Sequence, residues 1–129
     1  MPAINYFTVG SNKLEQAKVF YDALLGSIGM SPAFEHPSGG RLYRGKGIGM
    51  FGVLGPYDGN PATVGNGTMV ALEAKDQAQV DRVHAIALEH GGSDEGAPGL
   101  RGGGFYGAYF RDPDGNKLNA YCMPETKGE

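Results

Sequence analysis

The chain contains a single cysteine, Cys122, and no tryptophan. One cysteine excludes an internal disulfide, and it excludes a structural zinc site built from a cysteine cluster. Positive charge is also sparse, since 11 lysines and arginines face 14 acids and leave a formal net charge of −3. With no run of basic residues, the sequence argues against a nucleic acid or an anionic membrane as the main partner. A small or neutral partner fits better.

Long apolar runs are missing as well. Nowhere do about 18 apolar residues follow one another, which argues against a membrane-spanning helix. The first ten residues, MPAINYFTVG, lack the basic segment and the apolar core of a secretory signal. We therefore expect a cytoplasmic protein whose lone thiol is an inert core residue.

Glycine, in contrast, is abundant. The 129 residues include 23 glycines, while the hydrophobic share of 40% is ordinary for a globular protein. This length predicts one compact domain with a real core. So many glycines indicate tight turns between short strands.

The stretch FYGAYFRDPDGNKLNAYC at 105–122 predicts a β-hairpin. Two runs of alternating apolar and polar residues flank the turn DPDGN, in which proline presets one dihedral angle and glycine accepts a positive φ. Counting outward from this turn separates a core face from a face with polar atoms and aromatic rings. The core face holds Phe110, Leu118, Ala120 and Cys122, and the other holds Tyr109, Asn119 and Tyr121.

The first half of the chain begins with a predicted strand at 4–9. Apolar residues at helical spacing then predict a helix at 13–25, which Asn12 and Glu15 can cap as a capping box. Glycine-rich turns separate the strands that follow. These strands are expected at about 32–36, 41–44 and 48–54.

The second half repeats this order of elements. A strand at 68–74 precedes a helix that Asp76 and Gln79 can cap, and the segment 93–104 holds at most a short strand before the hairpin. The whole chain is thus expected to be one domain of two modules. Module one spans about 1–56, a linker about 57–66, module two about 67–123, and a short tail 124–129.

These elements predict an α+β fold of two βαβββ modules. A single helix can cover only one face of the sheet in its module. We therefore expect a curved, mostly antiparallel eight-stranded sheet around a cleft, with one helix per module on the outside. A ligand would bind in that cleft.

Two stretches carry a resemblance to a known family: INYFTVGSNKLEQAKVFYDALLG at 4–26 and YFRDPDGNKLNAYC at 109–122. The sequence resembles the vicinal oxygen chelate superfamily, which includes glyoxalase I, extradiol dioxygenases and bleomycin resistance proteins. The resemblance covers essentially the whole chain and implies the paired βαβββ modules. It also implies a homodimer, because members of this family commonly pair.

The resemblance further implies where a metal would bind. In metal-dependent members, His, Gln or Glu ligands on the first and last strand of each module face the cleft. Here these positions hold Tyr6, Met69 (or Thr68 in a register shifted by one) and Asn119, and 48–54 contains no acid, histidine or glutamine. A phenol, a thioether and an amide hold a divalent cation poorly. We expect no metal and no cofactor, with a divalent metal as the alternative.

Two ionisable residues are weak candidates for catalysis. His36 ends a strand and can titrate near the mouth of the cleft, while Glu73 is in phase with Met69 and can act as a base. His84 and His90 are expected to stabilise the surface of the second helix. The expected ligand-cleft residues are Tyr6, Met69, Tyr109, Asn119, Tyr121 and Arg101.

The sequence thus predicts a glyoxalase-like or bleomycin-resistance-like protein that binds a small organic molecule in a metal-free, aromatic cleft. One alternative is an enzyme of the same fold, a lyase, isomerase or dioxygenase. It would use a divalent metal, or an acid and base pair that includes His36 or Glu73. Another alternative is an interaction module whose cleft is filled by its own side chains.

Overall fold

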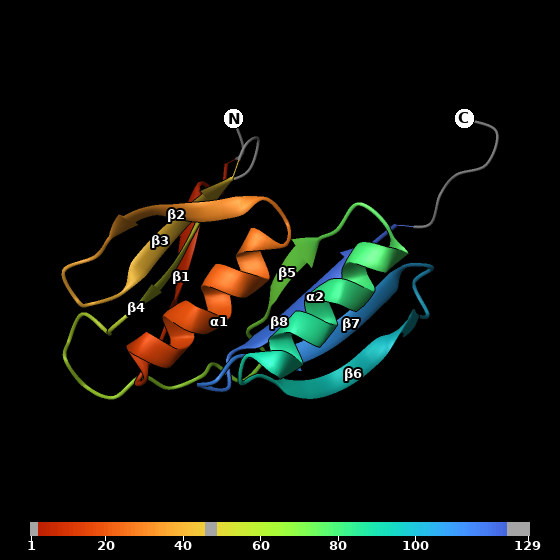
Figure 1. Ribbon diagram of the computed structural model, residues 1–129. Helices are drawn as coiled ribbons and strands as arrows, with labels where there is room; N and C mark the ends of the chain where they lie inside the picture. The colour runs from red at the N-terminus through yellow and green to blue at the C-terminus, as the bar shows by residue number, and fades with distance from the viewer. Residues whose placement is uncertain (1–2, 46–48, 124–129) are drawn as a thin grey trace.

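A computed structural model describes residues 3–45 and 49–123. Within these ranges each half of the chain is a βαβββ module, in the order expected (Figure 1). Module one contains β1 (Tyr6–Gly10), α1 (Leu14–Gly26), β2 (Met30–Glu35), β3 (Arg41–Gly45) and β4 (Met50–Leu54). Module two contains β5 (Val70–Glu73), α2 (Gln77–Glu89), β6 (Ser93–Leu100), β7 (Tyr106–Arg111) and β8 (Lys117–Cys122).

Each module forms its own four-stranded sheet, with strand orders β1-β4-β3-β2 and β5-β8-β7-β6. The first strand of each module runs parallel to the last strand, and the other neighbours are antiparallel. The α+β class and the two βαβββ modules are confirmed. Among residues 3–45 and 49–123, β1 and β5 each pair with a single strand, so the expected sheet of eight strands is divided into two sheets of four.

The two helices lie side by side, each against the sheet of its own module (Figure 1). One apolar core runs through both modules and includes side chains from both helices. Neither helix of the described ranges has the length and apolar content needed to cross a membrane. The largest fully buried side chains of this core are Tyr21, Tyr43, Phe20, Phe51 and Phe110.

The turn between β7 and β8 joins the two modules. Asp114 accepts hydrogen bonds from the Ser11 hydroxyl at 2.5 Å and from the Asn12 backbone N–H at 2.8 Å. Asn116 donates from Nδ2 to the carbonyl of Gly10 at 2.9 Å. Gly115 has a φ of 97°, which glycine adopts without steric cost. The predicted turn is therefore also the segment that fixes the end of β1 against module two.

The caps of the two helices differ from each other. Asp76 accepts from the Gln79 backbone N–H at 2.8 Å, so the cap predicted for α2 is confirmed. The capping box predicted for α1 is wrong, because the N-cap is Lys13 and not Asn12, and the Lys13 side chain makes no capping hydrogen bond. The Asn12 amide instead donates to and accepts from the backbone of Ala62 at 2.9 and 2.7 Å, so it ties the linker to the start of α1.

Most strands of module one, and β5, begin or end one or two residues from the expected position, and β6 differs most. β6 runs for eight residues, from Ser93 to Leu100, where at most a short strand was expected. It is an edge strand, and an edge position tolerates the missing N–H of Pro98. The strand expected at 48–54 is β4, which begins at Met50, and Ile48 lies outside the described residues.

Candidate functional site

The uncovered face of the module two sheet carries the polar and aromatic residues predicted there. Tyr109 lies opposite Asn119 in the β7–β8 register, and Tyr121 lies opposite Glu73 in the β5–β8 register. Leu118, which alternates with Asn119 along β8, is fully buried in the apolar core. Because side chains alternate along a strand, Tyr109, Asn119 and Tyr121 lie on the face opposite the core. The predicted division of the hairpin into two faces is confirmed.

Two cations contact the ring of Tyr109. The Arg101 guanidinium carbon and the Lys117 Nζ atom each lie 5.4 Å from the ring centroid, within the range of cation–π attraction. Arg101 also donates from Nη2 to the carbonyl of Ala97 at 2.6 Å. Lys117 is not among the predicted cleft residues, although it lies two residues before Asn119 on the same strand and so on the same face.

Asn119 stands where the resemblance places a closing glutamate. Its side chain is almost fully buried, and Nδ2 donates to the carbonyl of Ala108 at 3.0 Å across the β7–β8 pair. This hydrogen bond fixes the nitrogen end of the amide on the backbone. The amide oxygen accepts no hydrogen bond from any residue in 3–45 or 49–123.

The remaining expected cleft residues lie apart from this group. Tyr6 lies on β1 in the other sheet, opposite Met50, and its side chain is 55% exposed. Its neighbour Phe7 contacts the core ring of Phe51, so Tyr6 points to the uncovered face of its sheet. Met69 precedes β5 instead of lying on it, and it is exposed.

The residues at the expected metal positions do not fit a divalent metal. Tyr6, Met69 and Asn119 offer a phenol, a thioether and an amide whose nitrogen is bound to the backbone. The described residues of the β4 segment, Gly49 to Leu54, offer only apolar side chains and glycine. In the part of the chain that the structure describes, no three His, Cys, Asp or Glu side chains gather in a metal-binding arrangement.

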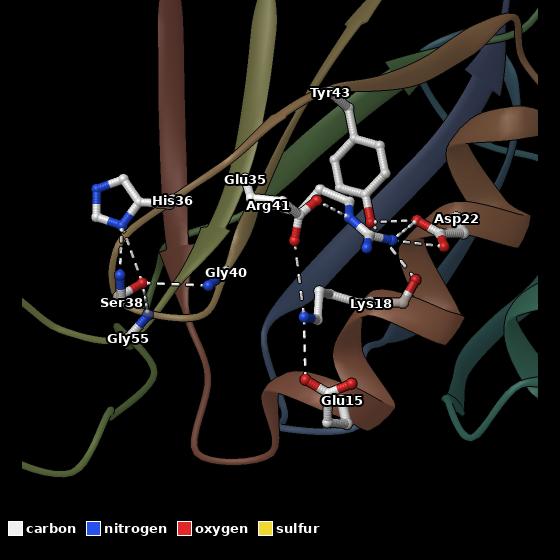
Figure 2. A network of polar contacts seen from close by, with 10 residues as sticks. All are labelled: Glu15, Lys18, Asp22, Glu35, His36, Ser38, Gly40, Arg41, Tyr43 and Gly55. Atoms are coloured by element: carbon white, nitrogen blue, oxygen red, sulfur yellow. Dashed lines mark hydrogen bonds and ion pairs between the residues drawn. The ribbon is translucent and has the colours of Figure 1, made fainter.

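His36 lines a cavity of about 960 Å³ between the ends of β1 and β4 and the linker. Its Nδ1 accepts from the Ser38 backbone N–H at 3.1 Å and lies 3.0 Å from the Ser38 hydroxyl (Figure 2). The neutral imidazole therefore carries its proton on Nε2. Further residues lining this cavity are Thr8, Leu54, Pro56, Tyr57, Asp58 and Ala62.

The Ser38 hydroxyl beside His36 is bound on both lone pairs. It accepts from the backbone N–H groups of Gly55 at 3.0 Å and Gly40 at 3.3 Å (Figure 2). An oxygen whose lone pairs are both occupied is a poor nucleophile, so these bonds favour a turn-stabilising role.

Glu73 lines a different cavity. This cavity has a volume of about 330 Å³ and is lined mainly by apolar residues of both modules, including Phe7, Met30 and Leu72. His36 and Glu73 therefore do not act together as an acid and base pair. The expected cleft residues Tyr6, Tyr109 and Asn119 line neither cavity.

A polar network between α1 and β2–β3 is structural (Figure 2). Arg41 donates to Asp22 at 2.7 Å and to Glu35 at 2.6 Å, and the Tyr43 hydroxyl donates to Asp22 at 2.7 Å. The hydrogen bond from Arg41 lowers the pKa of Glu35. Burial, followed by the bond to Asp22, raises the pKa of Tyr43 well above its usual value. These contacts hold α1 on its sheet and leave Glu35 pointing away from His36.

The expected surface role of His84 is wrong. Its side chain is buried between α2 and β6, and Nε2 lies 2.9 Å from the Asp94 carboxylate. This bond holds the pKa of Asp94 below its ordinary value. His90 does lie at the end of α2, where Nδ1 contacts the carbonyl of Ile86 at 2.8 Å.

Comparison with solved structures finds the same fold in several proteins. A glyoxalase/bleomycin resistance protein from Albidiferax ferrireducens T118 is 43% identical over 93% of this chain and 98% of that chain, with a TM-score of 0.86. A glyoxalase-related enzyme from Fulvimarina pelagi is 20% identical over 96% and 90% of the two chains, with a TM-score of 0.77. A lactoylglutathione lyase from Agrobacterium tumefaciens is 22% identical over 95% and 94%, with a TM-score of 0.68. The last two likenesses show the fold alone.

No match was found among curated proteins. A family model described as the Glyoxalase/Bleomycin resistance protein/Dioxygenase superfamily matches residues 3–120. This match covers nearly all of both modules and agrees with the structural likeness. The chain therefore belongs to the glyoxalase/bleomycin resistance protein/dioxygenase superfamily, the vicinal oxygen chelate superfamily that its sequence resembles.

Proposed function

We propose that this protein binds a small organic molecule on the uncovered faces of its two sheets and does so without a divalent metal. The observation that carries the proposal is Asn119, which replaces the expected carboxylate and is bound to the Ala108 carbonyl at 3.0 Å. Rings of Tyr109 and Tyr121 on the same face offer flat apolar surface with a hydroxyl at the edge. The proposed ligand-cleft residues remain Tyr6, Met69, Tyr109, Asn119, Tyr121 and Arg101.

A thermal-unfolding screen tests the proposal. Planar aromatic, thiol-conjugated and glycopeptide compounds are added to protein with and without EDTA. A ligand at about 100 times its dissociation constant stabilises the fold by about 2.7 kcal/mol, which raises the unfolding midpoint measurably. We expect a planar compound to stabilise both samples equally. Stabilisation by divalent metals alone, abolished by EDTA, would contradict the proposal.

A second candidate function is catalysis at His36. The observation that favours it is the cavity of about 960 Å³ beside a histidine whose free nitrogen is Nε2. The chemistry named for the Agrobacterium neighbour suggests a test with methylglyoxal and glutathione, assayed with and without added Zn²⁺ or Ni²⁺. Turnover that disappears in His36→Gln but persists in His90→Gln would favour this second function. Under the leading proposal, no turnover is expected.

We also propose that the protein forms a homodimer in the cytoplasm. Apolar side chains on and before β1 support pairing, because Ile4 is 74% exposed and Phe7 is 39% exposed. The single buried thiol, Cys122, is compatible with a reducing compartment. Sedimentation equilibrium should give twice the chain mass, and a monomer at micromolar concentration would contradict pairing.

A further inference from the structure

We propose that the uncovered face of the module two sheet binds a planar aromatic anion, whose acidic group is attracted by the two cations that contact the Tyr109 ring, Arg101 and Lys117. This inference rests on the proposed function, and it deepens that function by naming the chemical class of the ligand. Both cations lie 5.4 Å from the centroid of that ring.

Within the described residues, the two cations have no acidic partner. Among residues 3–45 and 49–123, no carboxylate oxygen lies within 4.0 Å of the Arg101 or Lys117 side-chain nitrogens. In the same ranges Arg41 and Arg111 do pair with acids. In a chain of net charge −3, two such cations on one face form a local positive site.

The Arg101 guanidinium is held in position by the backbone. Nη2 donates to the Ala97 carbonyl at 2.6 Å, and the Arg101 N–H donates to the carbonyl of Phe105 at 2.8 Å. A guanidinium has five N–H donors in a fixed plane, so the bond to Ala97 leaves donors for the paired oxygens of a carboxylate. Pre-positioning of this kind lowers the entropy cost of binding.

Two glycines of β6 make room for the guanidinium. A Cβ atom at Gly99 would lie 3.1 Å from Arg101 Nη1, and one at Gly96 would lie 3.3 Å from Nη2 and 3.2 Å from a ring carbon of Tyr109. Neither glycine has a positive φ, so the backbone does not require glycine here. The space they leave is what allows Arg101 to lie over the Tyr109 ring.

The rest of this face suits a flat ring. Ala71 lies opposite Asn119 and contributes only a methyl group, so no large side chain of β5 projects from the sheet beside Asn119. Asn119 presents an amide oxygen that accepts no bond from the described residues. Glu73, on the β5 side, repels an anion and so directs the acidic group of the ligand toward the cations.

Isothermal titration with 2-naphthoate and its neutral analogue 2-naphthamide tests the inference. We expect naphthoate to bind at least about tenfold more tightly, because charge-assisted bidentate hydrogen bonds are the strong ones. Arg101→Gln and Lys117→Gln should each remove most of this preference. Arg82→Gln, which removes one exposed charge from α2, is the matched control and should keep this preference. Gly99→Ala should weaken naphthoate binding less than Arg101→Gln, since it displaces the guanidinium but keeps its charge.

Each outcome has a distinct meaning. Equal binding of the two probes, or naphthoate binding that Arg101→Gln leaves unchanged, would overturn the inference while the proposed function stands. If neither probe binds and no planar compound raises the unfolding midpoint, the proposed function itself fails. Urea unfolding of each variant, compared with wild type, checks that a variant that no longer binds is still folded.

Discussion

At the scale of single residues, the buried pair of Tyr21 and Asp112 shows how one side chain can connect two modules. The Tyr21 hydroxyl donates to Asp112 Oδ2 at 2.6 Å, and both residues are buried. Burial, followed by the charge of Asp112, raises the pKa of Tyr21 well above its ordinary value. The phenol therefore stays protonated and remains a donor to the turn.

Tyr21→Phe should destabilise the fold by about 1.5–3 kcal/mol, because a buried carboxylate loses a hydrogen bond. Urea unfolding measures this loss. Tyr43→Phe is the matched control and should cost less, since its acceptor Asp22 is more exposed and keeps its bond to Arg41. Equal losses in the two variants would contradict the importance of the Tyr21 contact.

Cys122 should react slowly with a thiol reagent in the folded protein. Its side chain lies in the apolar core at 5% exposure, and burial raises its pKa. Because the thiolate is the reactive form, a raised pKa and poor access both slow the reaction. The rate of modification by DTNB at pH 8, compared with that in urea, measures this protection. Equal rates in the two conditions would contradict the core position.

At the scale of elements, we expect the contact between α2 and β6 to depend on pH. Hydrogen bonds from His84, and then from the Gly96 N–H, lower the pKa of Asp94. A lowered carboxyl pKa contributes stability above its unfolded-state value of about 3.9, and this contribution is lost as pH falls through the folded-state value. Wild type should thus exceed Asp94→Asn in thermal midpoint at pH 7, and the difference should shrink on acidification below about pH 4. A difference that stays constant down to the acid limit would contradict this role.

Local sequence signals were sufficient for most elements. Strict alternation and the turn DPDGN predicted the β7–β8 hairpin and its two faces, because a period of two leaves little choice of register once the turn is fixed. β6 is longer than expected. Its glycines and Pro98 do not favour a strand, but backbone hydrogen bonds to β7 form one. The α1 cap was mispredicted because Asn12 binds Ala62, fifty positions away.

The candidate site was only partly predictable. The faces of Tyr109, Asn119 and Tyr121 follow from alternation, and the structure confirms them. The two cavities could not be predicted, because one depends on where the irregular linker lies and the other on how the two modules meet. Nor could the sequence show that Lys117 and Arg101 both contact the ring of Tyr109, because the position of Arg101 depends on the course of the loop after β6.

At the scale of the whole molecule, one face of each sheet packs on a core that both modules share, and the other face of each sheet is left uncovered by helices. The helices and the turn of β7–β8 fix the modules to each other, and the Ser27 carbonyl after α1 accepts from Gln79 Nε2 on α2 at 3.0 Å. Binding surfaces on such a scaffold are set by side chains on rigid strands, which favours a preorganised site. The same scaffold holds a metal in the metal-dependent members of this family. In this chain, the side chains of Tyr6, Met69 and Asn119 at the corresponding positions argue against a metal.

Metal content of the purified protein tests that reading most directly. Protein prepared without chelator and analysed by inductively coupled plasma mass spectrometry should hold far less than one equivalent of divalent metal per chain. Tyr6→Phe and Asn119→Ala should leave this residual content unchanged. Near-stoichiometric metal in the wild type, lost in either variant, would show that the phenol and the amide are ligands after all and would contradict the proposed metal-free site.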